Sequence, residues 1–290
     1  MSRLHAPMLD LSHRQELDWL AQLLADLRSA APGLELLLVG ALARDLLLHY
    51  GYGFEIERAT GDVDFALAVA DWNEFSAARD ALLASGLFAP YRNTAHRLQH
   101  TRHGWVDLIP FGAVERADGT IAWPPAGDEV MAVTGYAEAA ASSIAVTLPK
   151  GQSARVVSLP LLAVLKVLAW KDRHRFTQGK DAVDLGFVLR NYLEAGNIDR
   201  LYSEFPDVIT DEFDFEPTSG WLLGRDARAA LQQHSTRFDD VIQRLDDILA
   251  GELSPESESA LVLQLNRARP DQALKLLSAF HAGLMGASTP

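Results

Sequence analysis

Two carboxylates stand one residue apart at Asp62 and Asp64, in a stretch whose alternating β character predicts a strand over residues 62–69. Side chains of a strand alternate between its two faces, so both carboxylates point to one face and Val63 and Phe65 point to the other. Two unpaired carboxylates side by side repel each other, and a divalent cation relieves that repulsion. The pair therefore indicates a metal site. The structural alternative is that Asp62 caps a turn and Asp64 faces solvent.

A third carboxylate, Asp107, lies in an apolar strand predicted over residues 105–109. A lone acid among apolar residues is costly unless a partner compensates it. If this strand lies beside the strand 62–69, three carboxylates converge and can hold two magnesium ions about 3.5–4 Å apart, the arrangement that drives in-line phosphoryl transfer. The alternative is an ion pair between Asp107 and a neighbouring arginine.

A glycine turn precedes these acids in the chain. A short apolar strand predicted over residues 35–39 runs into Gly40-Ala41 and then into a helix predicted over residues 41–50. A glycine at this junction lets the backbone approach a ligand closely, and the start of a helix offers N–H groups to phosphate. Alone, Gly40 fits an ordinary helix start equally well. The order of glycine turn, helix, acid pair and third acid favours nucleotide chemistry.

The length of 290 residues favours two domains, because one domain usually takes about 100–200 residues. Strand and helix patterns mix over residues 1–159, and almost wholly helical patterns follow over residues 160–290. We therefore expect an α/β domain with a mixed sheet and flanking helices, followed by a helical C-terminal domain. A hydrophobic content of 48% excludes a disordered or collagenous chain.

The sequence has no cysteine, which excludes disulfides, thiolate nucleophiles and cysteine-bound metals. No apolar run reaches the roughly 18 residues that span a bilayer, and residues 1–14 hold no apolar signal core. We therefore expect a cytoplasmic protein without a membrane partner. The formal net charge of −13 argues against non-specific binding of duplex nucleic acid, which depends on neutralising phosphates.

Basic residues concentrate in residues 160–190, whereas residues 203–216 hold six acidic residues and no basic one. This basic island could hold a few phosphates of a single-stranded RNA end, with Trp170 as a stacking face. Its members are Lys171, Arg173, Arg175 and Lys180. The alternative is a solvated helix face with Trp170 in the core.

Three histidines, His96, His100 and His103, could suggest a further metal site. The strand predicted over residues 95–102 ends before His103 and separates it from the other two. We therefore expect these histidines to face solvent.

Two stretches of the first half carry a family resemblance, Val39-Gly40-Ala41-Leu42-Ala43-Arg44-Asp45-Leu46-Leu47-Leu48 and Thr60-Gly61-Asp62-Val63-Asp64-Phe65. They resemble the polymerase-β-type nucleotidyltransferases, whose signature is a glycine turn, a helix and an Asp-x-Asp strand. The turn departs from the usual Gly-Gly or Gly-Ser, because here Ala41 follows Gly40. Backbone contacts to phosphate survive that change, and a serine hydroxyl contact does not.

Three stretches of the second half narrow the resemblance: Leu159-Pro160-Leu161-Leu162-Ala163-Val164-Leu165-Lys166, Ala169-Trp170-Lys171-Asp172-Arg173 and Lys180-Asp181-Ala182-Val183-Asp184-Leu185. Together they resemble the AbiEii/AbiGii-type nucleotidyltransferase toxins. Those proteins have a lysine on a helix after the catalytic sheet, an arginine-rich turn and a Lys-Asp-x-x-Asp helix.

This resemblance implies a polymerase-β-like fold and a role for each matching residue. Asp62 and Asp64 would bind Mg²⁺ or Mn²⁺, and Asp107 would be the third carboxylate, which deprotonates or orients the acceptor hydroxyl. Lys166 would contact the triphosphate. The remaining nucleotide-binding positions that the resemblance implies are Gly40, Ala41, Arg44, Asp181 and Asp184, of which Asp184, or else Asp181, would meet the nucleotide or orient Lys166.

The resemblance implies transfer of a nucleoside monophosphate from a nucleoside triphosphate to an acceptor hydroxyl. The triphosphate would lie in a cleft between the two domains. The acceptor suggested by the toxin branch is an RNA end such as that of tRNA, and the chain would be the toxin that is paired with a cognate antitoxin. Two alternatives stay open: a small-molecule nucleotidyltransferase of the antibiotic-modifying kind, and a catalytically silent nucleotide-binding or partner-binding module on the same fold.

Overall fold

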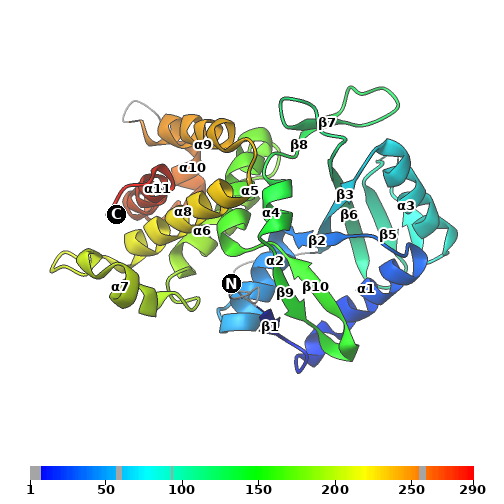
Figure 1. Cartoon of the computed structure of the whole chain (residues 1–290), viewed down its shortest axis with the longest axis horizontal. Coiled ribbons are helices and arrows are strands. Elements are labelled where there is room, and N and C mark those ends of the chain that lie inside the picture. Colours follow the sequence, from blue (N-terminus) through cyan, green and yellow to red (C-terminus); the bar gives the residue numbers. More distant parts are fainter. Residues whose placement is uncertain (1–7, 57–60, 93, 255–258) are drawn as a thin grey trace. The chain divides into compact units, whose positions relative to one another are not determined.

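The computed structural model describes residues 8–56, 61–92, 94–254 and 259–290. The chain forms two compact units, Met1–Ser158 and Leu159–Pro290, which Figure 1 shows in colours that follow the sequence. The domains expected from the sequence differ from these units in Leu159, the first residue of a helix. The predicted fold class is confirmed, because a mixed sheet with flanking helices comes first and a helical unit follows.

An eight-stranded mixed sheet is the centre of the first unit. Its strands are β1 (Met8–Asp10), β2 (Leu36–Val39), β3 (Asp62–Val69), β4 (Phe88–Pro90), β5 (Arg97–His100), β6 (Gly104–Gly112), β9 (Ile144–Thr147) and β10 (Ser153–Val156). They lie in the order β1-β9-β10-β2-β3-β6-β5-β4. A separate two-stranded sheet pairs β7 (Thr120–Ala122) with β8 (Val130–Ala132).

Two long helices, α1 (Asp18–Ala30) and α3 (Trp72–Ala84), contact each other beside the sheet (Figure 1). Helix α1 forms because its leucines recur at helical spacing, and these leucines are buried: Leu20, Leu23, Leu24 and Leu27. Helix α3 begins where the Asp71 carboxylate accepts a hydrogen bond of 2.9 Å from the backbone N–H of Glu74. The shorter helical segments are η1 (Gln15–Leu17), α2 (Gly40–Asp45), η2 (Leu46–Tyr50), α4 (Tyr136–Ala141) and η3 (Pro149–Gly151).

The second unit is helical. Its segments are α5 (Leu159–Arg173), α6 (Lys180–Asn191), α7 (Ile198–Glu204), η4 (Pro206–Val208), α8 (Phe215–His234), α9 (Phe238–Leu253), α10 (Ala260–Leu265) and α11 (Pro270–Met285). Helices α8 and α11 lie so close that glycine is required between them. A Cβ on Gly224 would lie 2.2 Å from the carbonyl oxygen of Phe280, and one on Gly283 would lie 2.1 Å from that of Trp221.

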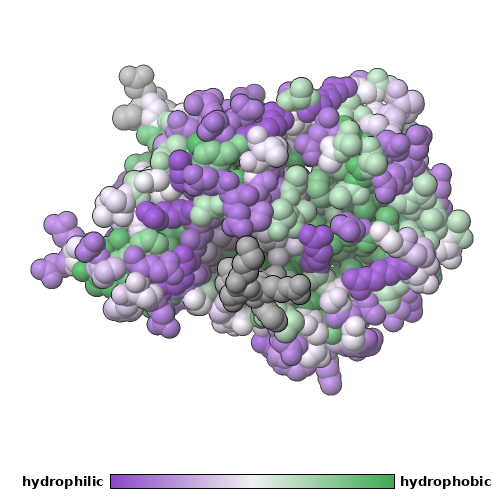
Figure 2. All heavy atoms as spheres, viewed as in Figure 1, coloured by the Kyte–Doolittle hydropathy of each residue, from purple (hydrophilic) through white to green (hydrophobic). Residues whose placement is uncertain are grey.

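Hydrophilic and hydrophobic residues are interspersed over the face that Figure 2 displays. Among the helices of the described residues, none combines the length and the apolar character that crossing a lipid bilayer requires.

Three details of the predicted elements are wrong. Apolar residues at helical spacing predict one helix over residues 11–29, but helical structure begins only at Gln15. The Asp10 carboxylate accepts a hydrogen bond of 2.9 Å from the N–H of Ser12 and closes a turn before it. The sequence predicts a hairpin of two strands over residues 144–148 and 155–159, but the second strand ends at Val156 and α5 begins three residues later. Strands β1, β4, β7 and β8 were not expected, since three residues are too few to show a period of two.

Candidate active site

The register of adjacent strands brings the predicted carboxylates into one row. Val39 of β2 lies opposite Asp64 of β3, and Asp64 lies opposite Asp107 of β6. Residues opposite each other on neighbouring strands share a face, and Asp62 shares that face because it lies two positions before Asp64. The structure thus places Asp62, Asp64 and Asp107 on one face of the sheet, at the end where β3 begins.

The glycine turn packs directly on one of these carboxylates. Gly40 has a φ of +72°, a backbone conformation that L side chains rarely adopt. A Cβ built on Gly40 would lie 2.1 Å from Oδ2 of Asp64. Gly40 is therefore required both by its backbone conformation and by the space that the Asp64 carboxylate occupies.

Replacing Gly40 with Ala should therefore displace Asp64. The positive φ costs roughly 1–2 kcal/mol for a residue with a Cβ, and misplacement of a reacting group by about 1 Å costs about 10²-fold in rate. We expect Gly40→Ala to lower transfer by about 10²-fold in a labelling assay. Gly61→Ala is the matched control, since nothing lies within 4 Å of a Cβ built there. Equal activity of the two variants would contradict this account of Gly40.

Asp62, Asp64 and Asp107 form a row of carboxylates, the acid row. Arg97 contacts this row, and no sequence pattern indicated that it would. It lies on β5 opposite Asp107. Its Nε donates to Oδ1 of Asp107 at 2.7 Å, and its Nη2 donates to Oδ2 of Asp107 at 2.5 Å and to Oδ2 of Asp62 at 3.0 Å. The hydrogen bonds to Asp107 raise the pKa of the Arg97 guanidinium, so that it stays charged at every working pH. The alternative prediction, that Asp107 forms an ion pair with a neighbouring arginine, is therefore confirmed.

The three carboxylates share one face of the sheet, but their oxygens are not all close together. In the described part of the chain, the oxygens of Asp62, Asp64 and Asp107 do not form a group within 4.8 Å of one another. Arg97 bridges Asp62 and Asp107 and compensates their repulsion.

The residues that follow Gly40 are buried. Ala41 is 5% exposed and Arg44 is 1% exposed. Nε and Nη2 of Arg44 donate to Oδ1 of Asp45 at 2.8 and 2.6 Å. This ion pair inside α2 favours a role for Arg44 in holding the helix, and its predicted contact with a nucleotide stays a prediction.

The second unit brings Lys166, Asp181 and Asp184 together. Nζ of Lys166 on α5 donates to Oδ2 of Asp184 at 2.6 Å and to Oδ1 of Asp181 at 3.1 Å, both on α6. The three side chains are 8%, 2% and 1% exposed, in the order lysine, Asp181, Asp184. The residues that the family resemblance singled out in this half therefore form one buried ion cluster.

Arg173 joins this cluster from the last turn of α5. Its Nε and Nη2 donate to the two oxygens of Asp181 at 2.8 and 2.9 Å. Burial alone would raise the pKa of Asp181, but the hydrogen bonds from Arg173 and the charge of Lys166 outweigh burial and lower that pKa to about 2.

This lowered pKa predicts a loss of stability in acid. The carboxylate of Asp181 is ionised in the folded protein down to about pH 2, whereas in the unfolded chain it takes up a proton near its ordinary value of 3.8. Its contribution is therefore complete above that value and is lost as the pH falls toward 2, by about 2 kcal/mol in total. Urea unfolding between pH 5 and pH 2 measures this. Asp181→Asn should show a shallower pH dependence over that range, and an identical one would contradict the assignment.

The prediction that Trp170 offers a stacking face to RNA is wrong, because its side chain is buried and only 1% exposed. Its Nε1 donates to Oε1 of Gln264 at 2.8 Å, and its ring stacks on His174. The tryptophan is part of the core of the helical unit. The basic residues Lys171, Arg175 and Lys180 are exposed.

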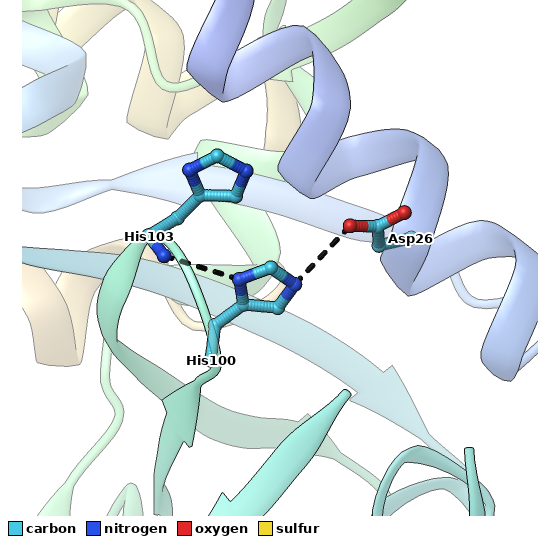
Figure 3. A group of neighbouring side chains, drawn as sticks. All are labelled: Asp26, His100 and His103. Carbon is cyan, nitrogen blue, oxygen red and sulfur yellow. Dashed lines mark hydrogen bonds and ion pairs between the residues drawn. The ribbon is translucent and has the colours of Figure 1, made fainter. Parts of the chain in front are cut away.

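The expectation for the histidines is also wrong for His100, which is 2% exposed. His100 and His103 stack with their rings 4.8 Å apart, and Nε2 of His100 lies 3.2 Å from Oδ2 of Asp26 on α1 (Figure 3). His96 lies elsewhere, against Trp123. One ligand atom from each of Asp26, His100 and His103 lies within 4.8 Å of the others, the spacing of a possible metal site.

The hydrogen bonds of this cluster favour a structural role instead. Nδ1 of His100 accepts hydrogen bonds from the backbone N–H groups of Arg102 and His103, each with a donor–acceptor distance of 3.2 Å. Burial lowers the pKa of His100, so its ring is neutral and carries its one proton on Nε2, facing Asp26. Both nitrogens are thus engaged, and a neutral His100 has no lone pair for a metal. The cluster links α1 to the turn between β5 and β6.

The comparison with curated proteins found no match. A family model described as nucleotidyl transferase AbiEii toxin, type IV toxin–antitoxin system, matches residues 22–263. That span contains the glycine turn, the row of carboxylates and the Lys166 cluster, and it covers most of the chain. The chain belongs to the AbiEii nucleotidyl transferase toxin family and is a nucleotidyltransferase.

Proposed function

We propose that the chain transfers a nucleoside monophosphate from a nucleoside triphosphate to an acceptor hydroxyl, with Mg²⁺ or Mn²⁺ bound by Asp62 and Asp64. The acceptor oxygen forms a bond to the α-phosphorus, the bond from that phosphorus to the bridging oxygen breaks, and pyrophosphate leaves. The observation that carries the proposal is the close packing of the Gly40 turn on Asp64, because it brings backbone N–H groups that can bind phosphate next to a carboxylate that can bind a cation.

The residues present fit a divalent cation. Carboxylate oxygens are the ligands that Mg²⁺ and Mn²⁺ prefer. Glycine at position 40 leaves room for the Asp64 carboxylate, since a Cβ there would lie 2.1 Å from its Oδ2. Asp62 and Asp107 both form ion pairs with Arg97, which supports the proposal that this face of the sheet attracts cations. A bound divalent cation would neutralise charge on the triphosphate and favour in-line displacement at phosphorus.

Asp107 differs from the other two carboxylates in its surroundings. Its side chain is 10% exposed, against 39% for Asp62, and both of its oxygens accept hydrogen bonds from Arg97. Because Arg97 occupies both oxygens, these contacts favour a role of Asp107 in orienting the acceptor hydroxyl. They are less compatible with a role as a third metal ligand.

The family resemblance implies that Lys166 contacts the triphosphate, and its surroundings within the helical unit are compatible with that role. The ammonium of Lys166 has three N–H donors, and two of them are directed to Asp181 and Asp184. Within the described residues the two aspartates are the acceptors of this ammonium, so we assign its third N–H to a phosphate oxygen. The backbone of Gly40 and Ala41 would contact phosphate in the sheet unit.

The proposed acceptor is an RNA end, with tRNA as the first candidate. Exposed Lys171, Arg175 and Lys180 offer a few positive charges in a chain whose net charge is −13. Binding should therefore depend on salt with a small slope, because few phosphates are neutralised. The charge-reversed variant Lys171→Glu/Arg175→Glu should lose RNA labelling and keep triphosphate binding. It leaves Arg173 in place, because Arg173 holds Asp181.

One labelling experiment tests the function. The full chain is incubated with Mg²⁺, total cellular RNA and each of the four nucleoside triphosphates, labelled either at the α- or at the γ-phosphate. We expect label in RNA from the α-phosphate only. Label found only in a small molecule would favour an antibiotic-type enzyme, and triphosphate binding without any transfer would indicate a silent module.

The biological role that we propose is the toxin half of a toxin–antitoxin pair in the cytoplasm, as the family description implies a cognate antitoxin. Expression of the wild-type chain should arrest growth, and expression of the Asp64→Asn chain should not. Arrest by both would place the toxicity outside the transfer reaction.

A further inference from the structure

Arg97 places a positive charge between the two acids that lie furthest apart in sequence within the row. Its Nη2 is shared, because it donates both to Oδ2 of Asp107 and to Oδ2 of Asp62. The contact with Asp107 is a two-bond fork in a mostly buried setting, whereas the contact with Asp62 is a single bond of 3.0 Å to a side chain that is 39% exposed. The bond to Asp62 is therefore the one that a competing cation can replace.

The charges of the acid row mean that this competition would change how tightly a metal ion binds. Three carboxylates and one guanidinium together carry a formal charge of −2, which one divalent cation would neutralise. A metal ion bound by Asp62 would lie within a few ångströms of the guanidinium, and charges at such distances repel strongly in a partly buried site. Either the cation or Arg97 can hold the near oxygen of Asp62.

We propose that Arg97 is an internal counter-ion of the acid row, which competes with a divalent metal ion for Asp62 and thereby sets the metal affinity of the site. This inference rests on the proposed function of Asp62 and Asp64 as metal ligands. Arg97 is a positioning residue in this account. It keeps Asp62 and Asp107 aligned by compensating their repulsion, and it moves off Asp62 while its fork stays on Asp107.

The test is a calorimetric titration of the full chain with Mn²⁺ alone, in the absence of nucleotide. Removal of the guanidinium charge in Arg97→Gln should tighten Mn²⁺ binding by about tenfold or more. Arg97→Lys keeps the charge and should bind Mn²⁺ close to the wild-type affinity. Arg79→Gln is the matched control, because its side chain is 24% exposed, against 28% for Arg97, and it lies outside the acid row.

Equal or weaker binding by Arg97→Gln would overturn the proposal, and so would binding by Arg97→Lys as tight as that of Arg97→Gln. If Arg97→Gln does not fold by circular dichroism, Arg97→Met replaces it, since methionine keeps the apolar stem and removes the charge. If Asp62 and Asp64 are not metal ligands, the titration gives a different result from those above. The wild type then binds no Mn²⁺, or Asp62→Asn/Asp64→Asn binds Mn²⁺ as tightly as the wild type does.

Discussion

Replacing Asp64 with Asn should lower the rate of nucleotidyl transfer by about 10³-fold or more, because a metal ligand supports several kcal/mol of transition-state stabilisation. The fold should be intact or more stable, since Asp64 stands in a row with Asp62 and Asp107 and loses a like-charge repulsion. The measurement is the initial rate of transfer of the α-phosphate label at saturating triphosphate, together with a thermal melt.

Asp80→Asn is the control for this variant. Asp80 lies on α3, and its side chain is 74% exposed. Its replacement should change neither the rate nor the melt. An Asp64→Asn chain that keeps more than a tenth of the wild-type rate would remove Asp64 from the machinery of the reaction.

Replacing Lys166 with Ala should destabilise the helical unit by about 3–5 kcal/mol, the usual cost of breaking a buried ion pair by removing one partner. The change leaves Asp184 buried without its 2.6 Å contact to the ammonium, and it leaves Asp181 with Arg173 alone. Chemical unfolding with the free energy extrapolated to water measures the loss.

Two comparisons separate the charge cluster from general effects of the substitution. Lys171→Ala removes an exposed lysine from the same helix, and it should change stability by no more than about 0.5 kcal/mol. Lys166→Met/Asp184→Asn removes one charge of each sign and should recover part of the loss, since the carboxylate that loses the ammonium is replaced by a neutral amide. A Lys166→Ala chain within 1 kcal/mol of the wild type would show that the cluster does not stabilise the unit.

The row of carboxylates was predictable because it follows from local periodicity. Alternation over β3 puts Asp62 and Asp64 on one face whatever the neighbouring strands do. Asp107 stood out because an acid in an apolar strand needs a partner. The helical second half was predictable for the same reason, since amphipathic spacing is a property of each segment alone.

Arg97 was not predictable, because its place depends on the register between β5 and β6. A turn at His103-Gly104 would set His100 opposite Asp107, whereas the observed three-residue turn sets Arg97 there and His100 opposite Gly104. A register shift by an odd number of residues also reverses which side chains face the core. The burial of His100 likewise depends on this pairing, which places it opposite Gly104 and against Asp26 of α1. The pairing of Lys166 with Asp181 and Asp184 depends on how α5 packs on α6, which spacing within either helix does not determine.

The thermal melt of the full chain in increasing Mg²⁺ or Mn²⁺ tests the central claim most directly, namely that Asp62 and Asp64 form a metal site. A cation that binds only the folded state stabilises it by mass action, by about 2.7 kcal/mol at a concentration 100 times the dissociation constant. The wild type should therefore melt at rising temperatures as the metal concentration increases, and Asp62→Asn/Asp64→Asn should not respond. An equal response of the two proteins would contradict the metal site and the mechanism built on it.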